Sequence, residues 1–144
     1  MTEHVLFLDT SALVRRYVAA PNRLLVIDAM ERADAWVATS LSLTETLLSL
    51  QQLALSPGHL SELWARVRGE WDGFWQVPID DRALSAAVEI GGRFGIGTVD
   101  ALQVAAASRL PRPASFCTFE RQQIPVAAEL GFDVIAPEAD GRRL

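Results

Sequence analysis

The sequence predicts an α/β protein of three layers, in which helices cover both faces of a mostly parallel central sheet. Short apolar segments alternate with helical segments along the chain, which is typical of right-handed strand–helix–strand crossovers. With 144 residues and 50% hydrophobic content, the chain can bury one core and is too short for two comfortable domains. We therefore expect one domain at residues 1–136, followed by a loosely attached tail at residues 137–144.

Periodicity and capping residues predict the individual elements. Short apolar runs predict strands at about residues 5–8, 35–38, 76–78, 115–118 and 133–135. Apolar residues at helical spacing predict helices at about residues 10–18, 23–32, 60–74, 98–109 and 123–130. Two more helices are expected to run from caps within residues 39–42 to residue 55, and from Asp80 to residue 94. Ser56-Pro57-Gly58 is expected to end the first of these two.

The composition excludes several functions. A net charge of -5 argues against a protein that coats nucleic acid by bulk attraction, because such domains are usually basic. All 13 basic residues are arginine, so the chain cannot supply the lysine of a Walker A loop or of a Schiff base. Cys117 is the single cysteine, which excludes an internal disulfide and, within an apolar segment, favours a buried structural thiol.

The sequence also predicts a protein without a membrane segment. No apolar run approaches the ~20 residues that a bilayer-spanning helix needs. The first residues, Thr2-Glu3-His4, differ from the basic start of a signal peptide. We therefore expect a cytoplasmic protein.

Four separated acidic residues stand where a predicted strand ends or an adjacent helix begins. They are Asp9, Glu45, Asp100 and Glu120. Each acid alone is most simply explained as a helix cap or a solvated side chain. In a parallel sheet, however, the carboxyl ends of neighbouring strands meet at one crevice, so we expect these acids to converge. Glu45 is also expected to be partly buried and therefore to meet an arginine or a cation.

A cluster of carboxylates favours a particular metal and a particular chemistry. Oxygen ligands suit Mg²⁺ or Mn²⁺, whereas zinc favours the cysteine and histidine ligands that this cluster lacks. Two such ions about 4 Å apart can generate hydroxide and stabilise the leaving oxygen of a phosphodiester. Hydrolytic phosphoryl transfer is therefore the chemistry that we expect.

Four motifs, in order, resemble those of the PIN-domain ribonucleases, and most closely the VapC-type toxins of bacterial toxin–antitoxin pairs. They are Leu8-Asp9-Thr10-Ser11-Ala12-Leu13, Thr44-Glu45, Gly97-Thr98-Val99-Asp100-Ala101-Leu102 and Thr118-Phe119-Glu120-Arg121. The resemblance spans nearly the whole chain and implies a PIN-like fold. It also implies a Mg²⁺- or Mn²⁺-dependent endoribonuclease with an RNA substrate, a homodimer, and inhibition by a cognate antitoxin.

The resemblance carries roles to individual residues. Asp9, Glu45 and Asp100 would be the principal catalytic metal ligands, with Ser11 and Thr118 as supporting polar groups. The departure is Glu120, where the family usually has aspartate. The extra methylene lengthens the reach of the carboxylate and adds a rotamer, so its hold on a second ion is the least secure part of the site.

Three arginines near the acids are candidate RNA contacts. Arg15 and Arg16 follow Asp9 by nearly two helical turns, and Arg121 stands beside Glu120. A solvated helix face is an equally good interpretation of each.

Three tryptophans, Trp64, Trp71 and Trp75, are spaced as one stripe of the long helix predicted at residues 60–74 and just beyond it. Packing against the preceding helix is the favoured interpretation, and a groove for an antitoxin segment is the alternative.

Two other functions are weighed against the toxin ribonuclease. One is a catalytically weak PIN-like module that acts mainly through protein binding, as Glu120 and the acidic balance would allow. The other is a phosphatase of the haloacid dehalogenase type, which fits poorly. That family has a second aspartate where this chain has Ser11, and it requires a lysine.

Overall fold

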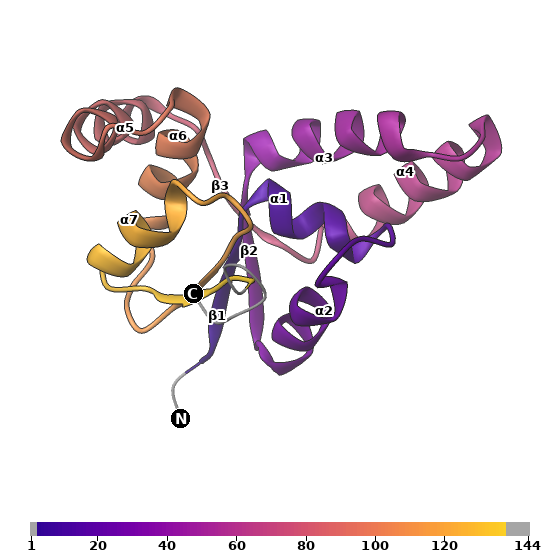
Figure 1. The fold of residues 1–144 in the computed structure, drawn as a ribbon, viewed down its shortest axis with the longest axis horizontal. Helices are drawn as coiled ribbons and strands as arrows, with labels where there is room; N and C mark the ends of the chain where they lie inside the picture. Colours follow the sequence, from indigo (N-terminus) through magenta and orange to yellow (C-terminus); the bar gives the residue numbers. More distant parts are fainter. Residues whose placement is uncertain (1–2, 138–144) are drawn as a thin grey trace.

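The computed structural model describes residues 3–137, which form three layers as the sequence predicts (Figure 1). One five-stranded sheet has the order β3-β2-β1-β4-β5, and every neighbouring pair of strands is parallel. The strands are β1 (Val5–Leu8), β2 (Ala35–Thr39), β3 (Trp75–Val77), β4 (Ser115–Cys117) and β5 (Asp133–Ile135). All five predicted strands are therefore confirmed.

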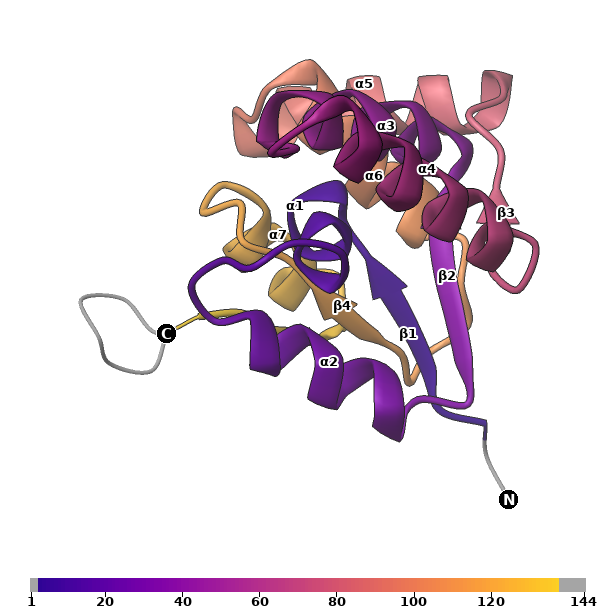
Figure 2. The same ribbon diagram turned by 90° about the vertical axis from the view of Figure 1, so that its right-hand side faces the viewer.

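Helices cover the two faces of this sheet, one group on each face (Figures 1 and 2). On one face lie α1 (Thr10–Leu13), the 3₁₀ turn η1 (Val14–Arg16), α2 (Arg23–Arg32), α3 (Ser40–Leu53) and α4 (Pro57–Trp71). On the other lie α6 (Thr98–Ala107) and α7 (Gln123–Glu129), with α5 (Asp81–Phe94) packed against α6. In Figure 1, the α3–α4 hairpin reaches beyond the edge of the sheet.

Side chains of the central strand β1 point alternately to the two faces of the sheet, where they join two separate parts of the core. Leu6 and Leu8 join the cluster formed with α1 to α4, whereas Val5 and Phe7 join the cluster formed with α6 and α7. All four residues are buried. A strand buried on both faces is a continuous apolar run, which is why residues 5–8 carry no polar residue. Asp9 is therefore the first polar side chain beyond this run.

Side-chain caps fix where most of the helices begin. Asp9, Thr39, Ser56 and Asp80 each accept a backbone N–H of the helix that follows. The expected break at Ser56-Pro57-Gly58 is only partly correct. The preceding helix ends earlier, at Leu53, and Ser56 caps α4, with Pro57 in its first position. The single helix predicted at residues 10–18 is wrong in detail, because α1 ends at Leu13 and continues as the 3₁₀ turn η1.

The predicted core packing is confirmed for two of the three tryptophans. Trp71 is buried, and Trp64 packs on the same cluster while its indole donates to Leu47 O at 2.9 Å. Trp75 lies outside the helix, because α4 ends at Trp71 and residue 75 begins β3, where its side chain is 49% exposed. Trp64 and Trp71 therefore belong to the core, and Trp75 does not.

Three remaining expectations concern Cys117, membrane segments and the tail. Cys117 is fully buried, which confirms the predicted buried thiol, and burial raises the pKa of the thiol to about 12. Within residues 3–137, no helix has the length and apolar character to cross a bilayer. The expected tail at residues 137–144 lies outside the described residues, apart from Pro137.

We predict that Thr46→Val stabilises the protein. Thr46 is fully buried in α3, and its hydroxyl finds no hydrogen-bond partner within residues 3–137. Removing an unsatisfied buried hydroxyl should raise the free energy of unfolding by about 1 kcal/mol, measured by urea denaturation.

Thr39→Val is the matched control, because Thr39 is equally buried and its hydroxyl caps α3 by accepting from Ser42 N. It should lower the free energy of unfolding by about 1 kcal/mol. A loss of stability in both variants would contradict the assignment of Thr46 as unsatisfied.

Candidate functional site

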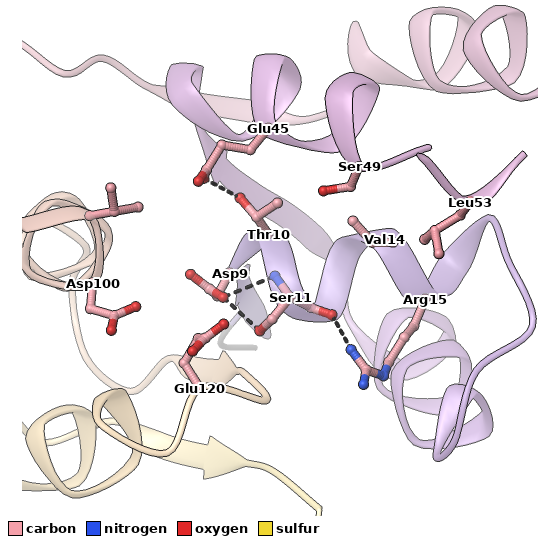
Figure 3. Close-up of a pocket in the computed structure, with 11 residues that line it drawn as sticks. Asp9, Thr10, Ser11, Val14, Arg15, Glu45, Ser49, Leu53, Asp100 and Glu120 are labelled. Atoms are coloured by element: carbon pink, nitrogen blue, oxygen red, sulfur yellow. Dashed lines mark hydrogen bonds between the residues drawn. The ribbon is translucent and has the colours of Figure 1, made fainter. Parts of the chain in front are cut away.

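The four acids singled out from the sequence border one cavity of about 310 Å³ at the carboxyl edge of the sheet (Figure 3). Asp9 follows β1 and Glu120 follows the neighbouring strand β4, while Glu45 comes from α3 and Asp100 from the first turn of α6. The cavity is lined by Asp9, Thr10, Ser11, Val14, Arg15, Glu45, Ser49, Leu53, Val99, Asp100 and Glu120. The topology thus brings together residues that are far apart in the sequence.

Asp9 is the most constrained of the acids. It is 4% exposed, and both of its carboxylate oxygens accept hydrogen bonds. Oδ2 accepts from the Ser11 backbone N–H at 3.0 Å and from the Ser11 hydroxyl at 2.6 Å. Oδ1 accepts from Gln123 Nε2 at 3.0 Å. The orientation of Asp9 is therefore fixed by donors on both sides of the carboxylate.

Glu45 is held through one of its two oxygens. Its Oε1 accepts from Thr10 Oγ1 at 2.7 Å and from Gln103 Nε2 at 3.1 Å. For its Oε2, the residues that the structure describes provide no hydrogen-bond donor. The sequence predicted an arginine or a cation beside this carboxylate. No arginine of residues 3–137 pairs with it; a hydroxyl and an amide meet it, because the apolar helix α6 brings Gln103 to this position, and the cation stays a prediction.

Asp100 and Glu120 face the cavity without hydrogen bonds to their carboxylates from residues 3–137 (Figure 3). Partial removal from water raises the pKa of each group, and the nearby negative charges add to the effect. For Asp100 those charges are Asp9 and Glu45, and for Glu120 they are the other three acids. The cavity therefore concentrates negative charge, and Arg15 is the one arginine in its lining within the part of the chain that the structure describes.

The four acids border the cavity but do not form a closed ligand cage. Among residues 3–137, no three acidic, histidine or cysteine side chains already sit in an arrangement that could hold one ion. Asp9 is fixed by its donors, whereas the carboxylates of Asp100 and Glu120 accept no hydrogen bond from residues 3–137.

The expected supporting residues, Ser11 and Thr118, both form hydrogen bonds with the segments that carry Asp9 and Glu120. The Ser11 hydroxyl donates to Asp9 and accepts from Phe119 N at 2.9 Å, which ties the end of β1 to the segment after β4. Thr118 is buried, and its hydroxyl accepts from the Glu120 N–H at 3.0 Å. Each therefore contacts the segment that carries an acid.

Sequence reasoning missed Thr10, Gln103 and Gln123. Gln103 and Gln123 are almost fully buried, and each donates to an acid. A signal for Gln103 was present, since it is the one polar side chain within Ala101-Leu102-Gln103-Val104-Ala105-Ala106-Ala107. Gln123 stands among polar residues, at Arg121-Gln122-Gln123, so nothing in the local sequence distinguishes it from a solvated side chain.

The three candidate arginines have different surroundings. Arg15 lines the cavity, where its guanidinium lies 3.7 Å above the Phe119 ring and donates to Ser11 O. Arg121 is exposed and is not part of the cavity lining. Arg16 instead forms a two-bond ion pair with Glu70, at 3.0 and 2.8 Å. We therefore withdraw Arg16 as a candidate RNA contact, because its donors already serve the packing of η1 against α4.

The fold and the site together define a class of protein. It is the class of α/β proteins that carry a cluster of acids around a cavity at the carboxyl edge of a parallel sheet. Within this class, the chain belongs to the PIN-domain family, because the family model described as PIN domain matches residues 6–114. That match runs from Leu6 in β1 to Ala114, just before β4, and so includes Asp9, Glu45 and Asp100 but not Glu120. Among curated proteins, no sequence matches the chain.

Solved structures with the same fold include components of toxin–antitoxin complexes. A chain of a toxin–antitoxin complex from Klebsiella pneumoniae has a TM-score of 0.68 at 14% identity, covering 88% of this chain and 94% of that one. FitAcB from Neisseria gonorrhoeae gives 0.67 at 16% identity, with 88% and 95% covered. VapBC-5 from Mycobacterium tuberculosis, of the VapBC family of toxin–antitoxin systems, gives 0.62 at 18% identity, with 92% and 98% covered. At these identities the likeness shows a shared fold.

We predict that Glu70→Gln destabilises the protein at neutral pH by about 1 kcal/mol. The Arg16 guanidinium holds the pKa of Glu70 below its ordinary value. The ion pair therefore stabilises the folded protein above the ordinary glutamate pKa of about 4.3, and that contribution is lost as the pH falls through the lowered value. Urea denaturation at neutral pH and below pH ~4 should show the difference between wild type and variant shrinking.

The control is Asp28→Asn, which removes an ion pair to Arg32 whose two side chains are 65% and 61% exposed. It should change the free energy of unfolding very little. A Glu70→Gln effect that is independent of pH would contradict the assigned ion pair.

Proposed function

We propose that this protein is a metal-dependent endoribonuclease and the toxin of a VapBC-type toxin–antitoxin pair. The observation that carries the proposal is the gathering of Asp9, Glu45, Asp100 and Glu120 around one cavity. Membership of the PIN-domain family and a fold shared with chains of toxin–antitoxin complexes support it. RNA is the proposed substrate, and a cognate antitoxin and a second copy of the chain are the proposed protein partners, in the cytoplasm where RNA is encountered.

The residues around the cavity fit Mg²⁺ or Mn²⁺. The lining contains carboxylates and hydroxyls but neither cysteine nor histidine, which is the donor set of hard divalent cations. Partial removal from water raises the pKa of Asp100 and of Glu120, and the neighbouring carboxylates add to the rise; a cation would relieve the part that comes from this negative charge. When bound, such a cation supplies an acidified water molecule and stabilisation of the charge that develops at the scissile phosphate.

The chain's own residues divide the remaining work. Asp9 and Glu45 are pre-oriented, so they would hold a cation with little loss of side-chain entropy. Asp100 and Glu120 would complete the ligand set after rotating toward it. Arg15, at the same cavity, is suited to an RNA phosphate, because its guanidinium lies over Phe119 and donates to Ser11 O and Pro21 O, which leaves Nη2 for a ligand.

We predict that Asp9→Asn lowers metal-dependent RNA cleavage by at least about 100-fold, because it removes a charged ligand and not only its support. Glu120→Asp should retain cleavage, and Glu120→Ala should weaken it. Cleavage of a pool of single-stranded RNA oligonucleotides is measured with Mg²⁺, with Mn²⁺ and with EDTA, and the product ends are analysed.

The controls separate the proposed enzyme from a protein-binding module. Circular dichroism should show that Asp9→Asn keeps the fold, because the asparagine side chain still accepts from Ser11. Cleavage by the purified chain that survives both EDTA and Asp9→Asn would contradict the proposal. A wild-type chain that binds a protein partner but cleaves no RNA would instead favour the catalytically weak module.

We predict that Arg15→Gln weakens RNA binding and makes it less dependent on salt. Loss of one phosphate contact should lower the slope of log affinity against log salt concentration by about 0.7 for a single strand. Binding is measured by fluorescence anisotropy in an Asp9→Asn background, which prevents cleavage. Arg121→Gln is compared directly, and Arg82→Gln, an exposed position on α5, is the control. Unchanged affinity and slope in Arg15→Gln would exclude Arg15 as a contact.

A further inference from the structure

Two buried glutamines repeat one arrangement around the acidic cavity. Gln103 is 1% exposed and Gln123 is 0% exposed. Each stands three residues after a cavity acid, Gln103 after Asp100 and Gln123 after Glu120. Asp100 and Gln103 both belong to α6, whereas Glu120 precedes α7 and its backbone oxygen accepts from the Gln123 backbone N–H at 3.0 Å. In each pair the acid lines the cavity, and the glutamine is buried outside the lining.

Gln123 connects three segments of the chain. Its Nε2 donates to Asp9 Oδ1 at 3.0 Å, and more weakly to the backbone oxygen of Asp100 at 3.5 Å. Its Oε1 accepts from the Thr118 hydroxyl at 2.6 Å. An ionised carboxylate can only accept hydrogen bonds, so the amide must turn its nitrogen toward Asp9. The Thr118 hydroxyl fixes this orientation from the other end of the amide.

Gln103 makes an equivalent set of hydrogen bonds around Glu45. Its Nε2 donates to Glu45 Oε1 at 3.1 Å and to the Ser42 hydroxyl at 3.0 Å, with Thr10 Oγ1 at 3.3 Å. Its Oε1 accepts from the Thr39 hydroxyl at 3.2 Å. The amide is again anchored by a threonine hydroxyl at its oxygen, so its nitrogen is committed to the side on which the glutamate lies.

We propose that Gln103 and Gln123 are positioning residues that orient Glu45 and Asp9 for a divalent cation. This inference rests on the proposed function and extends it to two residues that do not line the cavity. Each amide occupies one lone pair of a carboxylate oxygen and leaves the rest of the carboxylate for a ligand. Outer hydrogen-bond partners of this kind set the direction and the basicity of a metal ligand.

The arrangement also couples the acids to one another. Asp100 and Gln103 share α6, so a shift of that helix would move one acid and the donor to another, Glu45. Glu120 and Gln123 likewise belong to the segment that enters α7, and Gln123 holds Asp9. The spacing of the acids is therefore maintained by side chains that cross between α6 and α3, and between α7 and β1.

A purely structural role is the competing explanation, because buried polar groups need partners whatever the site does. The two explanations differ in one measurable respect. A structural glutamine contributes to the free energy of unfolding but leaves the cation affinity of the folded protein unchanged. A positioning glutamine changes that affinity even under conditions in which the variant is fully folded.

The test compares Gln103→Met and Gln123→Met with wild type. Methionine keeps the length and flexibility of the side chain and removes the amide donor. Mn²⁺ binding is measured by electron paramagnetic resonance and by calorimetry, and metal-free thermal unfolding is recorded for each variant. We expect the Mn²⁺ dissociation constant to rise about 10-fold or more in both variants. Gln52→Met, on the exposed side of α3, is the matched control and should leave the affinity unchanged.

Each outcome decides the inference. A folded methionine variant whose Mn²⁺ affinity stays within about twofold of wild type would overturn the role of that glutamine and leave the proposed function intact. If a methionine variant does not fold, the asparagine variant replaces it, since it keeps an amide but withdraws it by one methylene. Unchanged affinity there would overturn the inference equally. A wild-type chain that binds no Mn²⁺ would overturn both the inference and the proposed metal dependence.

Discussion

Mutual repulsion among four carboxylates is the constraint to which the rest of this site responds. The parallel sheet places Asp9 and the segment of Glu120 at the ends of adjacent strands, and α3 and α6 add Glu45 and Asp100 to the same cavity. Like charges held together away from water are costly unless donors or a cation compensate them. The structure answers with hydroxyls and amides for two of the acids, and it leaves the other two with raised pKa values.

The hydrogen-bond donors that stabilise the charged acids come from the same segments of the chain that carry the acids. Ser11, two residues after Asp9, donates to it, and the same hydroxyl accepts from Phe119 on the neighbouring segment. Gln103 and Gln123 are further donors of this kind, since the side-chain amide of each extends from its own helix to an acid on another element. Electrostatic relief and the packing of helices on the sheet are thus achieved by the same side chains.

The sheet and the gathering of the acids around one cavity could both be predicted from the sequence. Each follows from local patterns, because apolar runs form the parallel strands and the acids stand near the junctions of strands and helices. Asp9 ends an apolar run, and Asp100 begins a helix, whatever the remainder of the chain does. Gln123 and the Arg16–Glu70 pair could not be predicted in this way, since their partners lie 114 and 54 residues away in the chain. Trp75 was misplaced for a related reason. Its spacing continues the stripe of α4, but the chain leaves the helix after Trp71 to pair β3 with β2.

Glu120 differs from Asp9 in how its carboxylate is held, although both side chains border the same cavity. A longer side chain is poorly tolerated where donors fix a carboxylate on both sides, as they do for Asp9. Glu120 has no such donors within residues 3–137, and its backbone N–H, not its carboxylate, is bonded to Thr118. One extra rotatable bond costs entropy only when the group becomes ordered. The longer side chain of Glu120 can therefore be accommodated by rotation about its own bonds, without disturbing Asp9 or Glu45.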